Sequence, residues 1–149
     1  MTDAQFTDLD IQDFADSINF GLILLDQNKS VLIWNEWIEK RSHVSKRDAL
    51  GKHILFAFNE SLNKEFIYNL NSVYDFGLPL ILSDELHQRM LPLFESENKN
   101  HLIDHTISVR LIKRFSSDLL CLIQVSEADR SKKSKEIRSK SSQISLAFF

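Results

Sequence analysis

Apolar and polar residues alternate in the last third of the chain, and this alternation predicts a strand. Within residues 101–114, every second position holds an apolar residue or a histidine, and these residues would share one face: Ile103, His105, Ile107, Val109 and Leu111. A period of two over this length indicates a strand with one face in water. A polar turn follows, and residues 119–125 form a second apolar run. The two segments therefore predict a β-hairpin.

The first third of the chain predicts a helix followed by a second hairpin. Residues 8–18 place apolar side chains at helical spacing. Residues 20–25 and 30–34 are short apolar runs, and the polar residues 26–29 between them are typical of a turn.

The middle of the chain predicts helices. Asn35 is suited to cap a short helix, and Gly51 is suited to end a second one over residues 45–50. Residues 60–76 carry a clear apolar stripe, and Gly77 follows as a stop signal.

The remaining segments complete a prediction of the fold class. Residues 78–82 read as a strand, whereas the apolar run 53–58 fits a helix and a strand equally well by periodicity. The order is helix, two strands, short helices, one longer helix and three strands. It predicts an α+β fold with a five-stranded antiparallel sheet and helices in the middle of the chain.

Composition narrows the class of protein. A chain of 149 residues with 43% hydrophobic residues can bury the core of one ordinary domain. The net charge of -3 gives no sign of a nucleic-acid surface. The polar, acidic start lacks the pattern of a secretory signal, and no apolar run approaches membrane-spanning length, so we expect a cytoplasmic protein without membrane contact.

The end of the chain changes character. Residues 129–142 are charged and rich in serine, which predicts an exposed helix or a linker. The following segment, ISLAFF over residues 144–149, is apolar again. Ile137 and Ile144 are seven residues apart, which allows a weak coiled-coil seam.

Several short motifs resemble those of PAS domains, in the same order. Gly21–Asp26 resembles the first PAS strand, and Val31–Asn35 resembles the second strand with the Asn that starts the next helix. Leu50-Gly51-Lys52 resembles the L-G-K/R motif in the middle of these domains, and Leu122–Glu127 resembles the last strand. The resemblance covers roughly residues 10–130. It implies a helical cap over residues 1–19, a PAS sensory domain over 20–127 and a charged helix or linker over 128–149. It also implies that the helices in the middle of the chain pack on one face of the sheet.

A narrower resemblance concerns the sensory-box domains that precede GGDEF diguanylate cyclases or histidine kinases in bacteria. The Trp34–Trp37 segment, the Phe76–Pro79 step and residues 82–94 carry it. It implies a sensor rather than an enzyme. The sensor would control an output module in cis or in trans, for which a diguanylate cyclase is the favoured candidate and a histidine kinase is the alternative. The 149 residues contain no such output module.

The resemblance and the pattern together suggest a ligand cavity between the sheet and the helices. The residues expected to line it are Ile23, Phe56, Phe66, Leu70, His105, Ile107 and Ile123. PAS domains often end in an Asp-Ile/Val-Thr step that relays the signal. Here Glu127-Ala128-Asp129 takes its place, without the β-branched and hydroxyl residues of that step, so Glu127 and Asp129 are the relay candidates.

No cofactor is required by the sequence. His105 could ligate haem or a ligand carboxylate, but a histidine bonded to a protein neighbour is the favoured interpretation. Trp34 and Trp37 could stack on a flavin, although core packing is favoured for both. Cys121 lies in an apolar strand, not in the Asn-Cys-Arg motif of flavin photochemistry, and is best read as a small buried residue. No histidine, cysteine or acidic cluster has the spacing of a metal site.

Three functions compete at this point. The first is a sensor that binds a small molecule and forms a homodimer. The second is a ligand-free dimerisation scaffold that pairs through residues 8–18 and the adjacent sheet face. The third is a small NTF2-like enzyme using His105 and Asp104, which we disfavour because adjacent strand residues face opposite sides.

Overall fold

The computed structural model describes residues 8–59, 62–83, 86, 90–95, 97–113 and 118–128. Its elements are α1 (Asp8–Asp16), β1 (Gly21–Leu25), β2 (Val31–Trp34), α2 (Glu36–Ser42), α3 (Lys46–Ala49), α4 (Ile54–Ala57), α5 (Lys64–Phe76), β3 (Leu80–Leu82), β4 (His105–Lys113) and β5 (Leu119–Glu127). No helix in these ranges is both long and apolar enough to cross a membrane.

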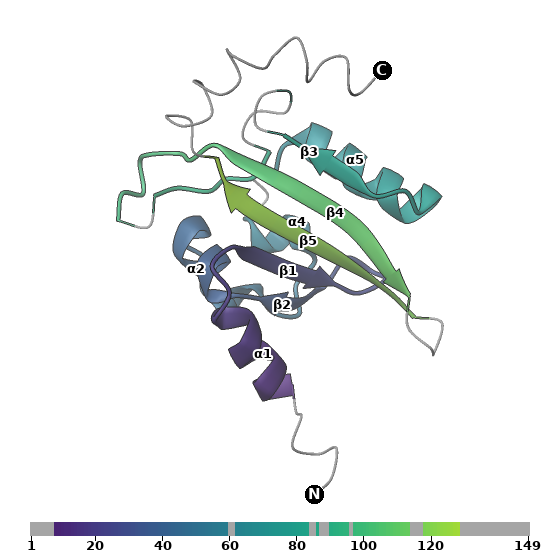
Figure 1. Cartoon of the computed structure of the whole chain (residues 1–149), viewed down its shortest axis with the longest axis horizontal. Coiled ribbons are helices and arrows are strands. Elements are labelled where there is room, and N and C mark those ends of the chain that lie inside the picture. Colours follow the sequence, from purple (N-terminus) through teal and green to yellow (C-terminus); the bar gives the residue numbers. More distant parts are fainter. Residues whose placement is uncertain are drawn as a thin grey trace, which may run out of the picture.

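The five strands form one antiparallel sheet in the order β2-β1-β5-β4-β3 (Figure 1). The two predicted hairpins are present, and β1 joins them by pairing with β5. The register aligns Leu82 with Ile107 and Ile107 with Val125, so the ends of β3 and β5 lie at the same end of the sheet.

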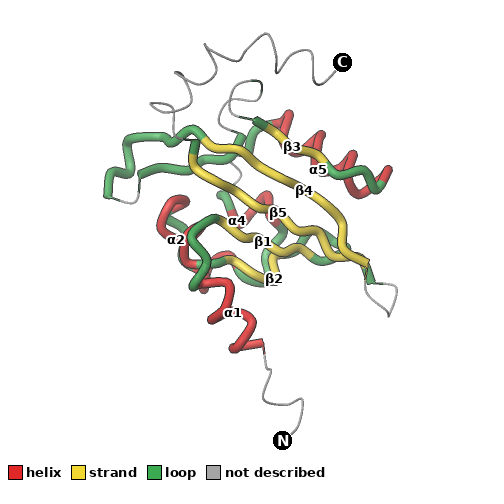
Figure 2. Tube along the Cα trace, viewed as in Figure 1, coloured by secondary structure: helices red, strands yellow, loops and turns green. Residues whose placement is uncertain are grey.

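The core lies between the sheet and the helices that follow β2, whereas α1 extends beyond the β2 edge of the sheet (Figure 2). Alternate residues of β4 and β5 are buried there, including Ile107, Val109 and Ile123. The buried stripe of α5 packs in the same cluster through Phe66, Leu70 and Val73. The predicted inward face of residues 103–111 is therefore confirmed.

Helix ends follow the capping residues seen in the sequence. The Asn35 side chain accepts the backbone N–H of Ile38 at the start of α2. Helix α5 ends at Gly77, whose φ of 70° is readily accessible to glycine. Asn63 caps the start of α5, so the helix begins at Lys64, and residues 60–61 of the predicted helix lie outside the described residues.

Gly21 is required by close packing rather than by its backbone angles. A Cβ atom at this position would lie 2.6 Å from Ile38 Cδ1 and 2.8 Å from Trp37 Cε3. Helix α2 can therefore approach the start of β1 only because position 21 carries no side chain. This contact fixes α2 against the sheet.

Candidate functional site

The strands and α5 bring six of the seven predicted cavity residues together. Ile23 of β1 is aligned with Ile123 of β5, and Ile107 of β4 lies on the same buried face. Phe66 and Leu70 reach this face from α5. These five residues are at most 2% exposed and form part of one continuous core.

Phe56 lies elsewhere, with 53% of its surface exposed. The run 53–58 forms the short helix α4, which buries Ile54 and Ala57 and turns Phe56 outward beside the His53 ring. Our expectation that Phe56 lines the interior is therefore wrong. A helical turn and a strand send different residues of the same apolar run inward.

His105 lies in the core with only 1% of its surface exposed, and protein groups occupy both of its ring nitrogens. The backbone N–H of Leu91 donates to Nε2 at 3.2 Å, and Nδ1 lies 3.1 Å from the carbonyl oxygen of Ile103. Because Nε2 accepts, the proton of the neutral ring belongs on Nδ1, which donates to Ile103. This arrangement matches a histidine bonded to its neighbours, and it leaves no lone pair directed at a ligand.

A second polar group borders the core near the β1–β2 turn. The Tyr74 hydroxyl donates to the carbonyl oxygen of Asp26 at 2.7 Å, and the Lys29 ammonium lies 4.7 Å from the centre of the Tyr74 ring. Burial, together with the neighbouring Cys121, raises the pKa of Tyr74 well above its usual range. Burial also raises the pKa of the Cys121 thiol to about 11, so the thiol stays protonated and unreactive at neutral pH.

Asn35 has a larger role than the helix cap that the sequence predicts. Its amide nitrogen donates to the carbonyl oxygens of Ala15 and Phe20, each at 2.9 Å, and its oxygen accepts the backbone N–H of Leu22 at 3.0 Å. The side chain is completely buried. It therefore joins the end of α1, the start of β1 and the start of α2, and sequence spacing alone gave no sign of these partners.

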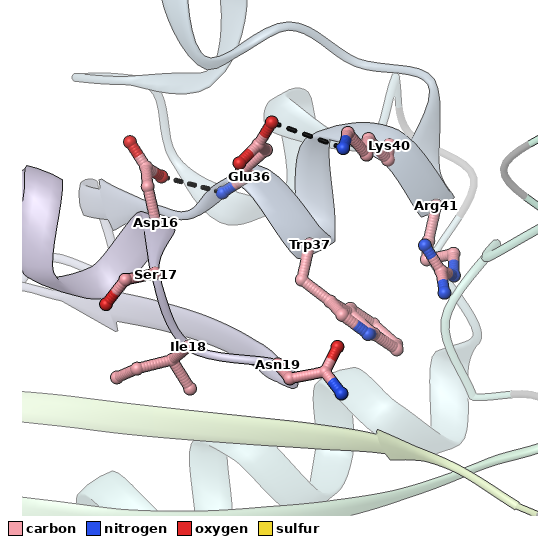
Figure 3. Close-up of a pocket in the computed structure, with 8 residues that line it drawn as sticks. All are labelled: Asp16, Ser17, Ile18, Asn19, Glu36, Trp37, Lys40 and Arg41. Atoms are coloured by element: carbon pink, nitrogen blue, oxygen red, sulfur yellow. Dashed lines mark hydrogen bonds and ion pairs between the residues drawn. The ribbon is translucent and has the colours of Figure 1, made fainter.

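A surface hollow of about 190 Å³ opens beside this junction, between α1 and α2 (Figure 3). Its charged groups are largely engaged with one another: Asp16 accepts the backbone N–H of Glu36 at 2.7 Å, and Glu36 pairs with Lys40 at 3.2 Å. Asp16 also pairs with Lys46. These interactions hold α1 against α2 and offer little free charge for a ligand.

Arg41 connects α2 to the end of the last strand. Its guanidinium lies over the Trp37 ring, 4.9 Å from the centre, and 3.7 Å from the Glu127 carboxylate. Its carbonyl oxygen accepts the backbone N–H of Phe94 at 2.7 Å. Glu127, one of the two predicted relay residues, therefore has a defined partner, whereas Asp129 lies outside the described residues.

Metal ligation finds no support in the described ranges, where no three histidine, cysteine or acidic side chains are placed to hold an ion. A second hollow, of about 240 Å³, lies beside Arg41 and is lined by Glu95, Glu97 and Glu127. It is open to solvent, and the Glu95 carboxylate there pairs with His101 at 2.8 Å.

The sheet order and the single layer of helices define the PAS class of fold, as the sequence predicted. No protein-family model matches the sequence, and no curated protein sequence matches it. Solved structures match in fold. A sensory box sensor histidine kinase from Vibrio cholerae has a TM-score of 0.56 at 19% identity, with 84% of this chain and 94% of that chain covered.

Two further structures agree with this fold. The PAS domain of BvgS from Bordetella pertussis has a TM-score of 0.56 at 10% identity, covering 95% of this chain and 99% of that chain. A PAS domain from a two-component sensor histidine kinase has a TM-score of 0.55 at 8% identity, covering 84% and 99%. The chain therefore has the PAS fold.

Proposed function

We propose that this chain is a regulatory PAS domain of bacterial signal transduction, which converts the binding of a small molecule into a change at the end of β5. The observation that carries this proposal is the contact between Arg41 and Glu127. It joins the core-packed helix α2 to the last described strand at the point where the chain continues towards residues 129–149.

Strand β5 is suited to carry such a change. Cys121, Ile123 and Val125 lie in the core, and Glu127 lies at the strand end beside Arg41. The backbone N–H of Ala128 donates to the carbonyl oxygen of Asp104 at 2.8 Å, which extends the pairing by one residue. A displacement of the strand in the core would therefore reach this terminal hydrogen bond through rigid, paired backbone.

The input site in this proposal is the interior between β1, β4, β5 and α5. Side chains fill the space around Phe66, Leu70 and Ile123, so a ligand would have to select a state in which α5 stands further from the sheet. A ligand shifts the domain only if it binds this state more tightly than the packed one. A small, largely apolar molecule meets that requirement with the least loss of hydrogen bonding.

A second candidate function is a dimerisation scaffold without a ligand. Two large apolar side chains of α1 are exposed, Ile11 at 49% and Phe14 at 69%. They stand on a helix whose other side packs against α2 and β2. Pairing of two copies through α1 and the adjacent sheet face would cover them, and the filled core favours this alternative.

The output module is the least constrained part of the proposal. The motif resemblance favours a diguanylate cyclase, with the cyclase domain in cis or in trans. Two of the three structures above favour a histidine kinase, because they are named as a sensor histidine kinase or as a domain of one. In both versions the PAS domain itself performs no catalysis, binds no nucleic acid and works in the cytoplasm.

The relay is tested by removing one charge of the contact. We expect Glu127→Gln to speed hydrogen exchange of the Ala128 amide while changing the free energy of unfolding by less than about 1 kcal/mol, because the pair is partly exposed. Lys40→Gln is the matched control, since it breaks an ion pair of the same helix without touching Glu127. Equal rates of hydrogen exchange at the Ala128 amide in both variants would show that Glu127 takes no part in the relay.

A further inference from the structure

Strand β3 forms an open, apolar edge of the sheet. Among the described residues it pairs only with β4, and none of them forms a backbone hydrogen bond with its outer side. Residues 76–83 (FGLPLILS) contain no charge, and β3 itself is Leu-Ile-Leu. Soluble proteins usually protect such an edge by keeping the strand short, or with charged residues, proline, a bulge or a covering segment. This edge has the first of these features and Pro79 before the strand, but neither supplies a backbone partner for its outer side.

The opposite edge of the sheet is protected in this way. The backbone N–H of Val31 in β2 donates to Lys52 at 2.8 Å, and the N–H of Gly51 donates to Val31 at 2.9 Å. Ser30 and His53 form an isolated bridge beside them. Residues 51–53 therefore cover the beginning of β2. The outer side of β3 has no such covering segment among the described residues.

Large apolar side chains surround the open edge. Phe76 is 73% exposed, Leu78 is 67% exposed and Ile81 is 72% exposed. They occupy the end of α5 and the beginning and middle of the segment that forms β3, which lie side by side in Figure 1. Exposed apolar side chains next to unpaired backbone are suited to bind an extended apolar segment.

We propose that residues 144–149 of this chain (ISLAFF) bind this edge as a sixth strand. The segment is uncharged, like the edge, and is rich in residues that favour strands. In an extended conformation, Ile144, Leu146 and Phe148 share one face, and Ser145, Ala147 and Phe149 share the other. The first face would lie against Phe76 and Leu78.

The connection is long enough for this arrangement. Leu82, Ile107 and Val125 are aligned across three strands, so the chain leaves β5 only two strand positions from β3. The added strand would lie roughly 15 Å from β5, at about 4.8 Å per strand position. Residues 129–143 span at most about 50 Å when extended, which covers this distance with slack. A tether of this kind also gives the segment a high effective concentration at the edge.

Hydrogen exchange of the β3 amides tests the proposal. We expect a chain that ends at Gln143 to exchange the amides of residues 80–82 about tenfold faster than the full chain, with β2 amides unchanged as an internal control. In the full chain, Leu146→Lys with Phe148→Lys should reproduce this loss. Ser145→Lys with Ala147→Lys adds the same charge to the other face and should retain most of the protection.

Three results would overturn the proposal. The first is equal exchange of residues 80–82 in the full and shortened chains. The second is protection that rises with protein concentration, which would assign the edge to a second copy. The third is loss of helical circular dichroism and of a dimer on shortening, which would assign residues 144–149 to a coiled coil. None of these readouts depends on a ligand. The proposed sensory function can therefore fail while this inference holds, and this inference can fail while the sensory function holds.

Discussion

His105 and Leu91 are joined inside the core by a hydrogen bond of 3.2 Å from the backbone N–H of Leu91 to the Nε2 atom of His105. The two residues are fourteen positions apart, and the bond fixes the loop before β4 against the buried face of the sheet. The imidazole thus satisfies one buried donor and, through Nδ1, the carbonyl oxygen of Ile103. We assign it a structural role in the packed state.

Replacing this histidine should be costly for stability. His105→Leu leaves the Leu91 N–H and the Ile103 carbonyl without their partner, and we expect a loss of roughly 2–4 kcal/mol in the free energy of unfolding. His101→Leu is the matched control, because His101 is exposed and should change stability little. Urea denaturation measures both variants, and similar midpoints for the two would contradict the assignment.

The role of Asn35 can be tested with an isosteric substitution, which keeps the shape of the side chain and changes only its hydrogen-bonding groups and charge. Asn35→Asp removes the two donors that reach Ala15 and Phe20 and places a carboxylate beside those carbonyl oxygens. We expect a destabilisation of about 3 kcal/mol or more at neutral pH. Asn63→Asp makes the same change at the exposed cap of α5, where aspartate caps equally well, and should be nearly neutral. Equal effects of the two substitutions would rule out this account of Asn35.

The contact of α2 with β1 depends on the missing side chain at position 21. Gly21→Ala places a methyl group against Ile38 and Trp37, and we expect a loss of about 1–3 kcal/mol from overpacking. Gly77→Asn is the control, because the space around Gly77 is open and asparagine tolerates its left-handed conformation. Thermal unfolding of the two variants distinguishes overpacking at position 21 from the general effect of replacing a glycine. An unchanged melting temperature for Gly21→Ala would show that α2 can move away from β1 without loss of stability.

Cys121 should make stability fall at high pH. Burial raises its pKa from 9.0 to about 11, so the native state retains the thiol proton over a range in which the unfolded chain loses it. The stabilisation is complete below about pH 9 and is lost as the pH rises towards 11. Unfolding measured at several pH values should show a shallower decline for Cys121→Ala than for the unchanged chain. Parallel declines would show that the native thiol titrates normally.

Sequence patterns predicted the parts of the fold in which periodicity is regular. The alternation through His105 and Ile107 placed the inward face of β4 correctly, and the caps at Asn35 and Gly77 were correctly identified. Residues 78–82 were read as a strand two residues longer than β3, because apolar content continues before Leu80 although pairing with β4 does not.

The site was harder to predict because its contacts join segments that are distant in sequence. The run 53–58 gave no decisive period, and Phe56 was consequently placed inside although α4 turns it outward. The pairing of Arg41 with Glu127 and the three segments joined by Asn35 depend on the packing of α2, which no local pattern encodes. Whether the six core residues bind a ligand remains a prediction.

The melting temperature of the purified chain, measured at a fixed protein concentration against a library of small metabolites, tests the sensory function most directly. We predict that one class of small, largely apolar compounds raises the melting temperature in a dose-dependent way, by an amount equivalent to about 2.7 kcal/mol at one hundred times the dissociation constant. The same compound should alter exchange of the Ala128 amide. No shift with any compound, together with no retained ligand in native mass spectra of the fresh protein, would contradict a ligand sensor and leave the dimerisation scaffold.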